Sequence, residues 1–204
     1  MAVGIKTAYV KIGDQVIELD HSYLGVAKAD IKGLSGNLTN INGSNQIQYT
    51  YAEPEKPTVA LTVNRAGSAL IAKLTGQKKV GKSNNLYTNG DKLPLVGLAV
   101  VSPEIGGDAD HMWVFPRCRA SVSSVSLSTN TDSKKNVVYD QITFNANSVP
   151  EFGGKCSAQG TVEVDGAPAE LKALGWAEPT TGAGDFKDDT DTDASTTPVV
   201  SQGN

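Results

Sequence analysis

An eight-residue segment in the middle of the chain matches the consensus of a phosphate-binding loop. Residues Gly76–Ser83 read GQKKVGKS and fit G-x-x-x-x-G-K-S at every fixed position. Such a loop binds phosphates when a strand leads into it and a helix begins directly after the Ser, because backbone N–H groups then point at the ligand. Here a helical pattern precedes the motif, and the turn-rich sequence NNLYTNGDKLP follows it. No Asp closes a buried apolar strand to hold magnesium. We interpret the segment as the end of a helix followed by a basic surface loop.

The two histidines are the remaining candidates for acid–base chemistry. His111 lies beside Asp108 and Asp110 at the start of an expected strand, and His21 follows Asp20. A Ser-His-Asp site needs a base that is held in place next to a nucleophile, and the chain has no G-x-S-x-G elbow. Neighbouring acids in a turn are usually solvated. The sequence therefore predicts no catalytic residue and no enzyme.

Metal and cysteine chemistry receives equally little support. The C-terminal acids do not follow the spacing of a calcium-binding EF-hand loop, so we interpret them as a solubilising run: Asp185, Asp188, Asp189, Asp191 and Asp193. Cys118 and Cys156 form no C-x-x-C pair, and two histidines do not complete a zinc ligand set. Free buried thiols are the favoured interpretation, while a single disulfide stays open. We expect no metal and no cofactor.

Length and composition fit one sizeable domain or two very small ones, soluble and with many turns. The chain has 204 residues, of which 39% are hydrophobic and 20% charged, and 21 are glycine. Of the net charge of −4, six acids and one lysine lie from Glu178 onward, so the remainder is close to neutral. That balance argues against a basic nucleic-acid footprint. The opening residues lack the apolar core of a signal peptide, and no run approaches the ~18 apolar residues of a membrane span. We expect synthesis in the cytoplasm and no membrane partner.

Period-two alternation of apolar and polar residues predicts strands along most of the chain. Lys6–Ile12 and Gln15–Leu19 alternate on either side of Gly13-Asp14, which is a hairpin signal. Val26–Leu34 fits a strand or a helical stripe, and we favour a strand because Gly33 and Gly36 close it. Three further strands are expected at Leu95–Ser102, Met112–Phe115 and Thr161–Val164.

Two further pairs of alternating runs suggest hairpins. Gln46–Tyr51 and Thr58–Val63 flank AEPEKP, whose prolines forbid continuous pairing, so we predict a long hairpin with a stiff polar tip. Val122–Thr129 and Val137–Ala146 flank a polar turn. In the first run of the second hairpin, alternation puts three serines on one face, which we predict to be a polar sheet face: Ser124, Ser126 and Ser128.

The spacing of apolar residues predicts one short central helix over Arg65–Thr75. Asn64 is a suitable N-cap and Gly76 a suitable C-cap. So short a helix persists only when its apolar stripe docks on a sheet, and that stripe consists of Ala66, Leu70, Ile71 and Leu74. Ala169–Leu174 could be a closing helix. We expect residues 1–177 to form one domain and 178–204 to form an acidic flexible tail or linker.

Several linked segments carry a resemblance to a known family. They are GVAKADIKGLSG (25–36), NGSNQIQYTYAEPEKPTVALTV (42–63), ALIAKLTGQKK (69–79) and LSTNTDSKKNVVYDQITF (127–144). In this order they make the chain similar to the major tail tube proteins of long-tailed, non-contractile bacteriophages, in the version found in phages and prophages of Gram-positive bacteria. Residues 82–93 do not align with the family.

The resemblance implies a mainly β fold, a β-sandwich of two packed antiparallel sheets with one short flanking helix. It further implies a structural virion protein that forms stacked, hexameric rings, with sheets joined into a barrel around a lumen that conducts double-stranded DNA. Partners would be further copies of the chain, the tape-measure protein and the tail-terminator protein.

Two surfaces are candidates for assembly if the chain is a tail tube protein, as the resemblance implies. The hairpin region would be an inter-subunit arm, comprising Gln46, Gln48, Tyr49, Tyr51, Glu53, Pro54, Glu55, Lys56 and Pro57. Its prolines would limit its freedom before docking. The serine face at 124, 126 and 128 would line the lumen. A carbohydrate-binding or adhesin-type β-sandwich is the alternative, and it would require Trp113 or Trp176 to be exposed for sugar stacking.

Overall fold

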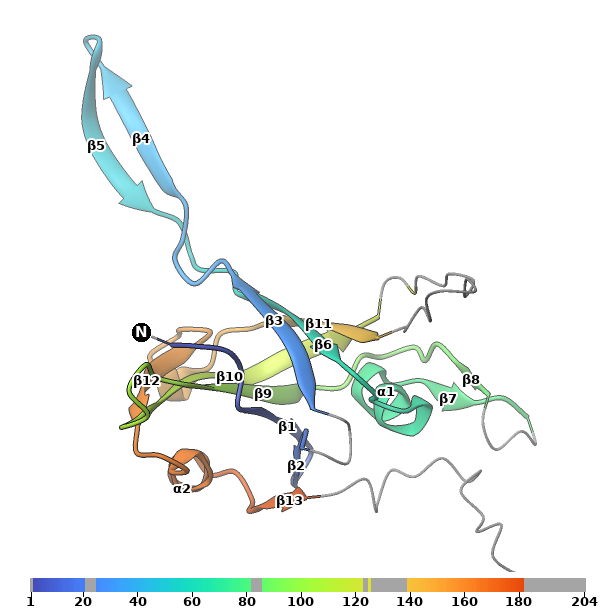
Figure 1. The fold of residues 1–204 in the computed structure, drawn as a ribbon. Coiled ribbons are helices and arrows are strands. Elements are labelled where there is room, and N and C mark those ends of the chain that lie inside the picture. Colours follow the sequence, from blue (N-terminus) through green and yellow to red (C-terminus); the bar gives the residue numbers. More distant parts are fainter. Residues whose placement is uncertain (1, 21–24, 82–85, 123–124, 126–138, 182–204) are drawn as a thin grey trace, which may run out of the picture.

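The computed structural model describes residues 2–20, 25–81, 86–122, 125 and 139–181, and its ribbon is shown in Figure 1. Most of the described strand residues belong to one nine-stranded sheet with the order β13-β2-β1-β9-β10-β11-β6-β3, in which β12 also pairs with β10. The first three strands along the chain are β1 (Thr7–Ile12), β2 (Gln15–Glu18) and β3 (Val26–Lys32). The predicted hairpin at Gly13-Asp14 and the strand assignment at 26–34 are confirmed.

The sheet folds over on itself at its longest strand and so makes the two layers of a β-sandwich. β10 (Asp110–Ser121) pairs with β9 (Val96–Pro103) and β12 (Ala158–Val162) through its first half. Its last four residues pair with β11 (Asp140–Ala146), which continues to β6 (Thr58–Val63). The register shifts between Phe115 and Cys118, around Pro116, which has no N–H to give to a ladder. The expected mainly β sandwich is confirmed.

The main core lies between the two layers. Alternation along β6 and β11 points Leu61, Ile142 and Phe144 inward, where they meet Val10 of β1 and Leu98 of β9. A second core lies on the other side of the first layer, where α2 (Ala167–Ala173) brings Leu171 and the following Trp176 against Val101 and Val114. The first layer is therefore buried on both faces. The second layer is buried on one face only, and its edge strand β3 has no fully buried residue.

The central helix, α1 (Ser68–Thr75), closes one end of the sandwich. Its predicted docking stripe is confirmed, since Ala66, Leu70 and Leu74 are buried in the main core and Ile71 packs against it. The predicted start is wrong: the N-cap is Gly67, not Asn64. The backbone N–H of Asn64 instead donates to the Gly25 carbonyl, so the chain finishes strand pairing before it turns into the helix. Gly76 is the C-cap, as predicted, with a left-handed φ of 69°.

The remaining elements are short. They are β7 (Lys78–Lys79), β8 (Tyr87–Thr88), the 3-10 turn η2 (Pro150–Phe152) and β13 (Pro179–Thr181). The predicted closing helix is α2, with Pro168 in its first turn. β13 pairs in parallel with β2, so the sheet includes three residues of the segment expected to be a tail, and the rest of that segment lies outside the described residues.

Candidate assembly surfaces

A two-stranded hairpin extends away from the sandwich, and we call it the arm (Figure 1). It consists of β4 (Leu38–Gly43) and β5 (Gln46–Ala52), which pair only with each other. Ser44 and Asn45 form its two-residue turn with φ values of 50° and 61°. Positive φ at both turn positions gives the twist that suits a tight hairpin, and Asn tolerates that conformation well.

The arm corrects the predicted hairpin. Gln46–Ala52 pairs with Leu38–Gly43 and not with Thr58–Val63, which lies in the sandwich between β3 and β11. The tip is therefore Ser44-Asn45, not AEPEKP. Both candidate partners alternate in polarity, so periodicity could not choose between them. The turn residues in NGSN were the signal that distinguished them.

The predicted arm residues divide between the arm and its base. Gln46, Gln48, Tyr49 and Tyr51 lie on β5, whereas the stretch Glu53–Pro57 leads back to the sandwich. Thr39 donates its hydroxyl to the Glu53 carboxylate over 3.2 Å. The Glu55 carboxylate accepts the backbone N–H of Cys156, and the Pro57 carbonyl accepts that of Ala146. These contacts attach the base of the arm to the sandwich.

The arm has one mainly apolar face and one mainly polar face, and Leu38 pairs with Ala52 on the polar face near the base of the arm. On the apolar face, Ile41 pairs with Tyr49 and Thr39 with Tyr51. On the polar face, the Thr50 hydroxyl donates to the Asn40 side-chain oxygen over 2.8 Å. The exposed fractions are 52% for Ile41, 62% for Ile47, 62% for Tyr49 and 42% for Tyr51. No charged residue occurs between positions 38 and 52.

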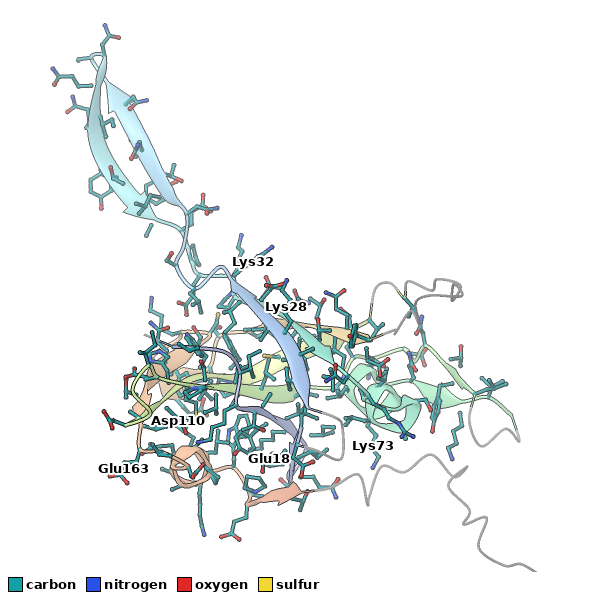
Figure 2. All side chains as sticks on the ribbon, viewed as in Figure 1. Glu18, Lys28, Lys32, Lys73, Asp110 and Glu163 are labelled. Carbon is teal, nitrogen blue, oxygen red and sulfur yellow. The ribbon has the colours of Figure 1, made fainter. Side chains whose placement is uncertain are left out.

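An isolated two-stranded hairpin is at best marginally stable in water, and large apolar side chains gathered on an exposed surface mark interaction sites. Within the described chain nothing packs on the apolar face of the arm, whose side chains extend into open space in Figure 2. The arm is therefore suited to bind another molecule.

A second surface is the outward face of the layer that contains β3, β6, β11 and the end of β10. The strand registers set side chains in three rows across this face: Lys28, Thr62 and Gln141; Asp30, Ala60, Thr143 and Ser121; Lys32, Thr58, Asn145 and Arg119. We call it the polar face. Lys28 and Asp30 form an ion pair at 2.6 Å, and the Arg119 guanidinium donates to the Leu93 carbonyl. Apart from Ala60, each member is polar or charged.

The serine face predicted at Ser124, Ser126 and Ser128 lies outside the described residues. The polar face was missed because Thr58–Val63 had been read as part of the projecting hairpin. Its signal was nonetheless present, since Thr58, Ala60 and Thr62 alternate with Val59, Leu61 and Val63.

Sheet edges form a third group of candidate surfaces. β3, β12 and β13 each pair with a neighbour on one side only among the described strands. An unpaired edge presents backbone N–H and C=O groups that can pair with another chain. β3 carries Lys28 and Lys32 along this edge and leads directly into the arm.

The described residues offer little for catalysis. Burial raises the pKa of the Cys118 thiol to about 12. Burial, aided by the Glu55 charge, also raises the pKa of the Cys156 thiol. Both cysteines are free, which decides between the two alternatives left open, and both thiols stay protonated and weakly nucleophilic. The His111 ring packs against Trp113 at an interplanar angle of 54°, with ring centroids 4.4 Å apart, and its Nδ1 lies 3.8 Å from a Glu104 oxygen.

The phosphate-loop motif does not have the geometry of a phosphate site where the structure describes it. Helix α1 precedes the motif, and Gly76 ends that helix with its N–H bonded to the Ala72 carbonyl. β7 follows at Lys78–Lys79, while Lys82 and Ser83 lie outside the described residues. The described side chains include no group of three or more His, Cys, Asp or Glu that could hold a metal ion. No helix in the described part of the chain is long and apolar enough to cross a membrane.

The tryptophans do not form a sugar-stacking platform. Trp176 is buried in the second core, with the Lys11 ammonium 5.7 Å from its ring centroid. Trp113 is half-buried, packs against the main core and is covered on one side by His111. The carbohydrate-binding alternative therefore loses the feature that it required.

Comparison with known families decides between these readings. The family model for phage tail tube proteins matches residues 3–160 of this chain. The chain belongs to the phage tail tube protein family. The match spans the arm, the polar face and both layers of the sandwich, and it makes the protein a structural component of a phage tail.

No curated protein matches the tail tube chain. Among solved structures, it is similar to the cryo-EM structure of the anti-feeding prophage cap, described as the AFP tube terminating cap. That pair shares 14% sequence identity over 79% of this chain and 94% of the other, with a TM-score of 0.36. A similarity of that size adds nothing to the family match.

Proposed function

We propose that this tail tube protein self-assembles into rings, six copies to a ring, that stack into a tube through which double-stranded genomic DNA passes. The observation that carries the proposal is the arm. It presents five large exposed apolar side chains, four of them on one face, and no charge, away from the core of its own subunit. Burial of that face against a neighbouring copy would supply the hydrophobic free energy that the isolated hairpin lacks.

Unpaired strand edges support lateral assembly. The outer edge of β3 can add to a free edge of the next copy, because backbone groups on both edges need partners. The contact joins two different surfaces, so it is heterologous, and a heterologous contact closes into a ring when the rotation per copy divides the circle. A ring built this way would continue the polar-faced layer from subunit to subunit.

The polar face is our candidate for the wall of the lumen, together with the serines at 124, 126 and 128. Small hydroxyl and amide side chains keep such a wall hydrated. Of its four charged side chains, Asp30 pairs with Lys28 and Arg119 donates to a backbone carbonyl, which leaves Lys32 as the remaining cation. A conduit benefits from few free cations because each Lys or Arg contact with phosphate retards DNA.

Introducing charge tests the lumen assignment. Phage carrying Thr143→Glu or Ser124→Glu should assemble tails of normal length and eject DNA at an altered rate. If Thr143→Glu instead prevents tube assembly, the polar face is a subunit contact and not the wall of the lumen. The tape-measure and tail-terminator proteins would be the further partners of such a tube.

Negative-stain electron microscopy of the purified full chain across a concentration series tests the central proposal. We expect rings or stacked tubes of uniform width that appear above a threshold concentration. Single particles of monomer mass at every concentration, with and without purified tape-measure and initiator components, would contradict self-assembly.

A further inference from the structure

Charged side chains gather at opposite ends of the sandwich. The basic patch, as we define it, consists of Lys73, Lys78, Lys79 and Lys92, with Asp91 as the nearby acid. The acidic end consists of Glu104, Asp108, Asp110, Glu163 and Asp165, with Lys6 as the nearby base. Formal charges are therefore +3 for the basic patch and −4 for the acidic end.

The local fold explains why the segments that carry the basic patch lie close together. Lys73 lies in the last turn of α1, and the left-handed Gly76 ends that helix. A Cβ on Gly76 would lie 2.3 Å from the Lys92 carbonyl, and one on Gly90 would lie 2.0 Å from the Gly76 carbonyl. These two close backbone approaches hold the segments that carry the four lysines against each other.

The acidic end is equally well defined. Asp110 pairs in register with Pro103 of β9 and Val162 of β12, which brings the β9–β10 turn next to the turn before α2. The Lys6 ammonium lies 2.6 Å from Asp110 and 2.7 Å from Asp165. The Asp110 side chain is 2% exposed. One cation therefore serves two carboxylates, and the surrounding acids keep this end negative.

The acidic end is hollowed, and its wall contains a buried hydroxyl that is unpaired within the described part of the chain. A cavity of about 450 Å³ opens there, lined in part by Lys6, Thr7, Asp110 and Asp165. The Thr7 hydroxyl is buried in its wall and has no hydrogen-bond partner among the described residues. Buried polar groups nearly always have a partner, so the Thr7 hydroxyl is an exception in the wall of this cavity.

The two charged surfaces cannot meet within one subunit. Lys92 comes shortly before β9, and Glu104 follows directly after it. The eight residues of β9 separate the two surfaces by roughly 25 Å at about 3.3 Å per residue. Figure 2 shows the separation, with Asp110 and Glu163 at one end of the sandwich and Lys73 below α1 towards the other.

We propose that the acidic end of one copy docks on the basic patch of a second copy, so that copies repeat head to tail. This inference rests on the proposed self-assembly and names the surfaces that make one of its contacts. The two surfaces differ, so the contact can propagate without closing. Complementary charge at the contact would fix the direction of stacking and exclude tail-to-tail pairing, which would set like charges together.

Charge reversal and charge exchange in the full chain test the proposal. Lys78→Glu with Lys92→Glu, or Asp108→Lys with Glu163→Lys, should each raise the threshold concentration for tube formation at least about tenfold. All four changes in one chain should restore it to within about threefold of wild type, because the contact is complementary again. Lys155→Glu, an exposed reversal elsewhere, is the matched control and should have no effect. Failure of the four-fold variant to assemble while its monomer melts normally would overturn the proposal.

Two measurements distinguish the head-to-tail contact from the proposed function and from a different occupant of the basic patch. If wild-type protein forms no tubes, the proposed function fails. If it forms tubes and the reversals leave the threshold unchanged, only the head-to-tail contact is wrong. The chain's own acidic C-terminal segment is the competing occupant of the basic patch. Changing its five aspartates (185, 188, 189, 191 and 193) to asparagine should leave the effect of the lysine reversals intact, and loss of that effect would identify the segment as the occupant instead.

Discussion

Removal of one aromatic ring from the arm should weaken assembly without weakening the subunit. Tyr49 is 62% exposed and lies on the apolar face opposite Ile41. A tyrosine presents ~150–250 Å², so a neighbouring copy can cover roughly 120 Å² of this residue. At about 25 cal/mol per Å² that burial contributes ~3 kcal/mol per arm, and the ordering of side chains at the contact reduces it to ~1.5–3 kcal/mol. Each ~1.4 kcal/mol is a factor of ten in an equilibrium constant.

Tyr49→Ala should therefore raise the threshold concentration for tubes by about 10- to 100-fold. The assay is sedimentation of the protein over a concentration series, with the protein left in the supernatant giving the threshold. Thr50→Ala, on the opposite face of the same strand, is the matched control and should change the threshold by less than about threefold. Tyr49→Phe should assemble almost as wild type, because the ring supplies the buried area.

The melting temperature of the monomer keeps this test interpretable. Because the arm pairs only with itself and contributes nothing to either core, Tyr49→Ala should leave that temperature unchanged. An unchanged threshold for Tyr49→Ala, or an equal shift for Thr50→Ala, would refute the argument that the apolar face of the arm is an assembly contact.

Three further predictions concern the subunit. Thr7→Val should stabilise the monomer in urea by ~1 kcal/mol, because it removes a buried hydroxyl without a partner and keeps the shape of the side chain; a loss of stability would show that the hydroxyl is bonded in solution. Hydrogen bonds to Asp110 and Asp165 raise the pKa of Lys6 above its usual 10.5, so its contribution to stability should be complete below pH 10.5 and fall as pH rises further. In Lys6→Met the loss of stability above pH 10.5 should be smaller than in wild type. An equal loss in both proteins would show that other groups cause it. Gly97→Ala should destabilise the fold by ~1–3 kcal/mol, because a Cβ there would lie 2.7 Å from the Trp176 ring. Gly160→Ala, where a Cβ meets nothing within 4 Å, is the control in the same thermal melt.

Local sequence signals located most of the secondary structure. Alternation identified β6 and β11, because a strand with one buried face places apolar residues at every second position. β9 is instead a nearly continuous apolar run, and it is buried on both faces. The Gly13-Asp14 hairpin and the Gly76 cap were visible because glycine adopts positive φ at little cost. The helix start was misplaced, because Asn64 would cap a helix well in isolation but is held by a backbone bond to Gly25 across the sheet.

What the sequence by itself determined was the β class, the docking stripe of α1, the family resemblance and the presence of a hairpin arm around Gln46–Ala52. Only the tertiary structure decided which strands pair, because Gln46–Ala52 and Thr58–Val63 have the same period and the choice depends on contacts between residues far apart in the sequence. It also decided the polar face, whose members come from four strands that span Lys28 to Asn145. The separation of charge was equally hidden in the sequence. The net charge of −4 adds the acidic and basic surfaces together, whereas in the structure β9 separates them.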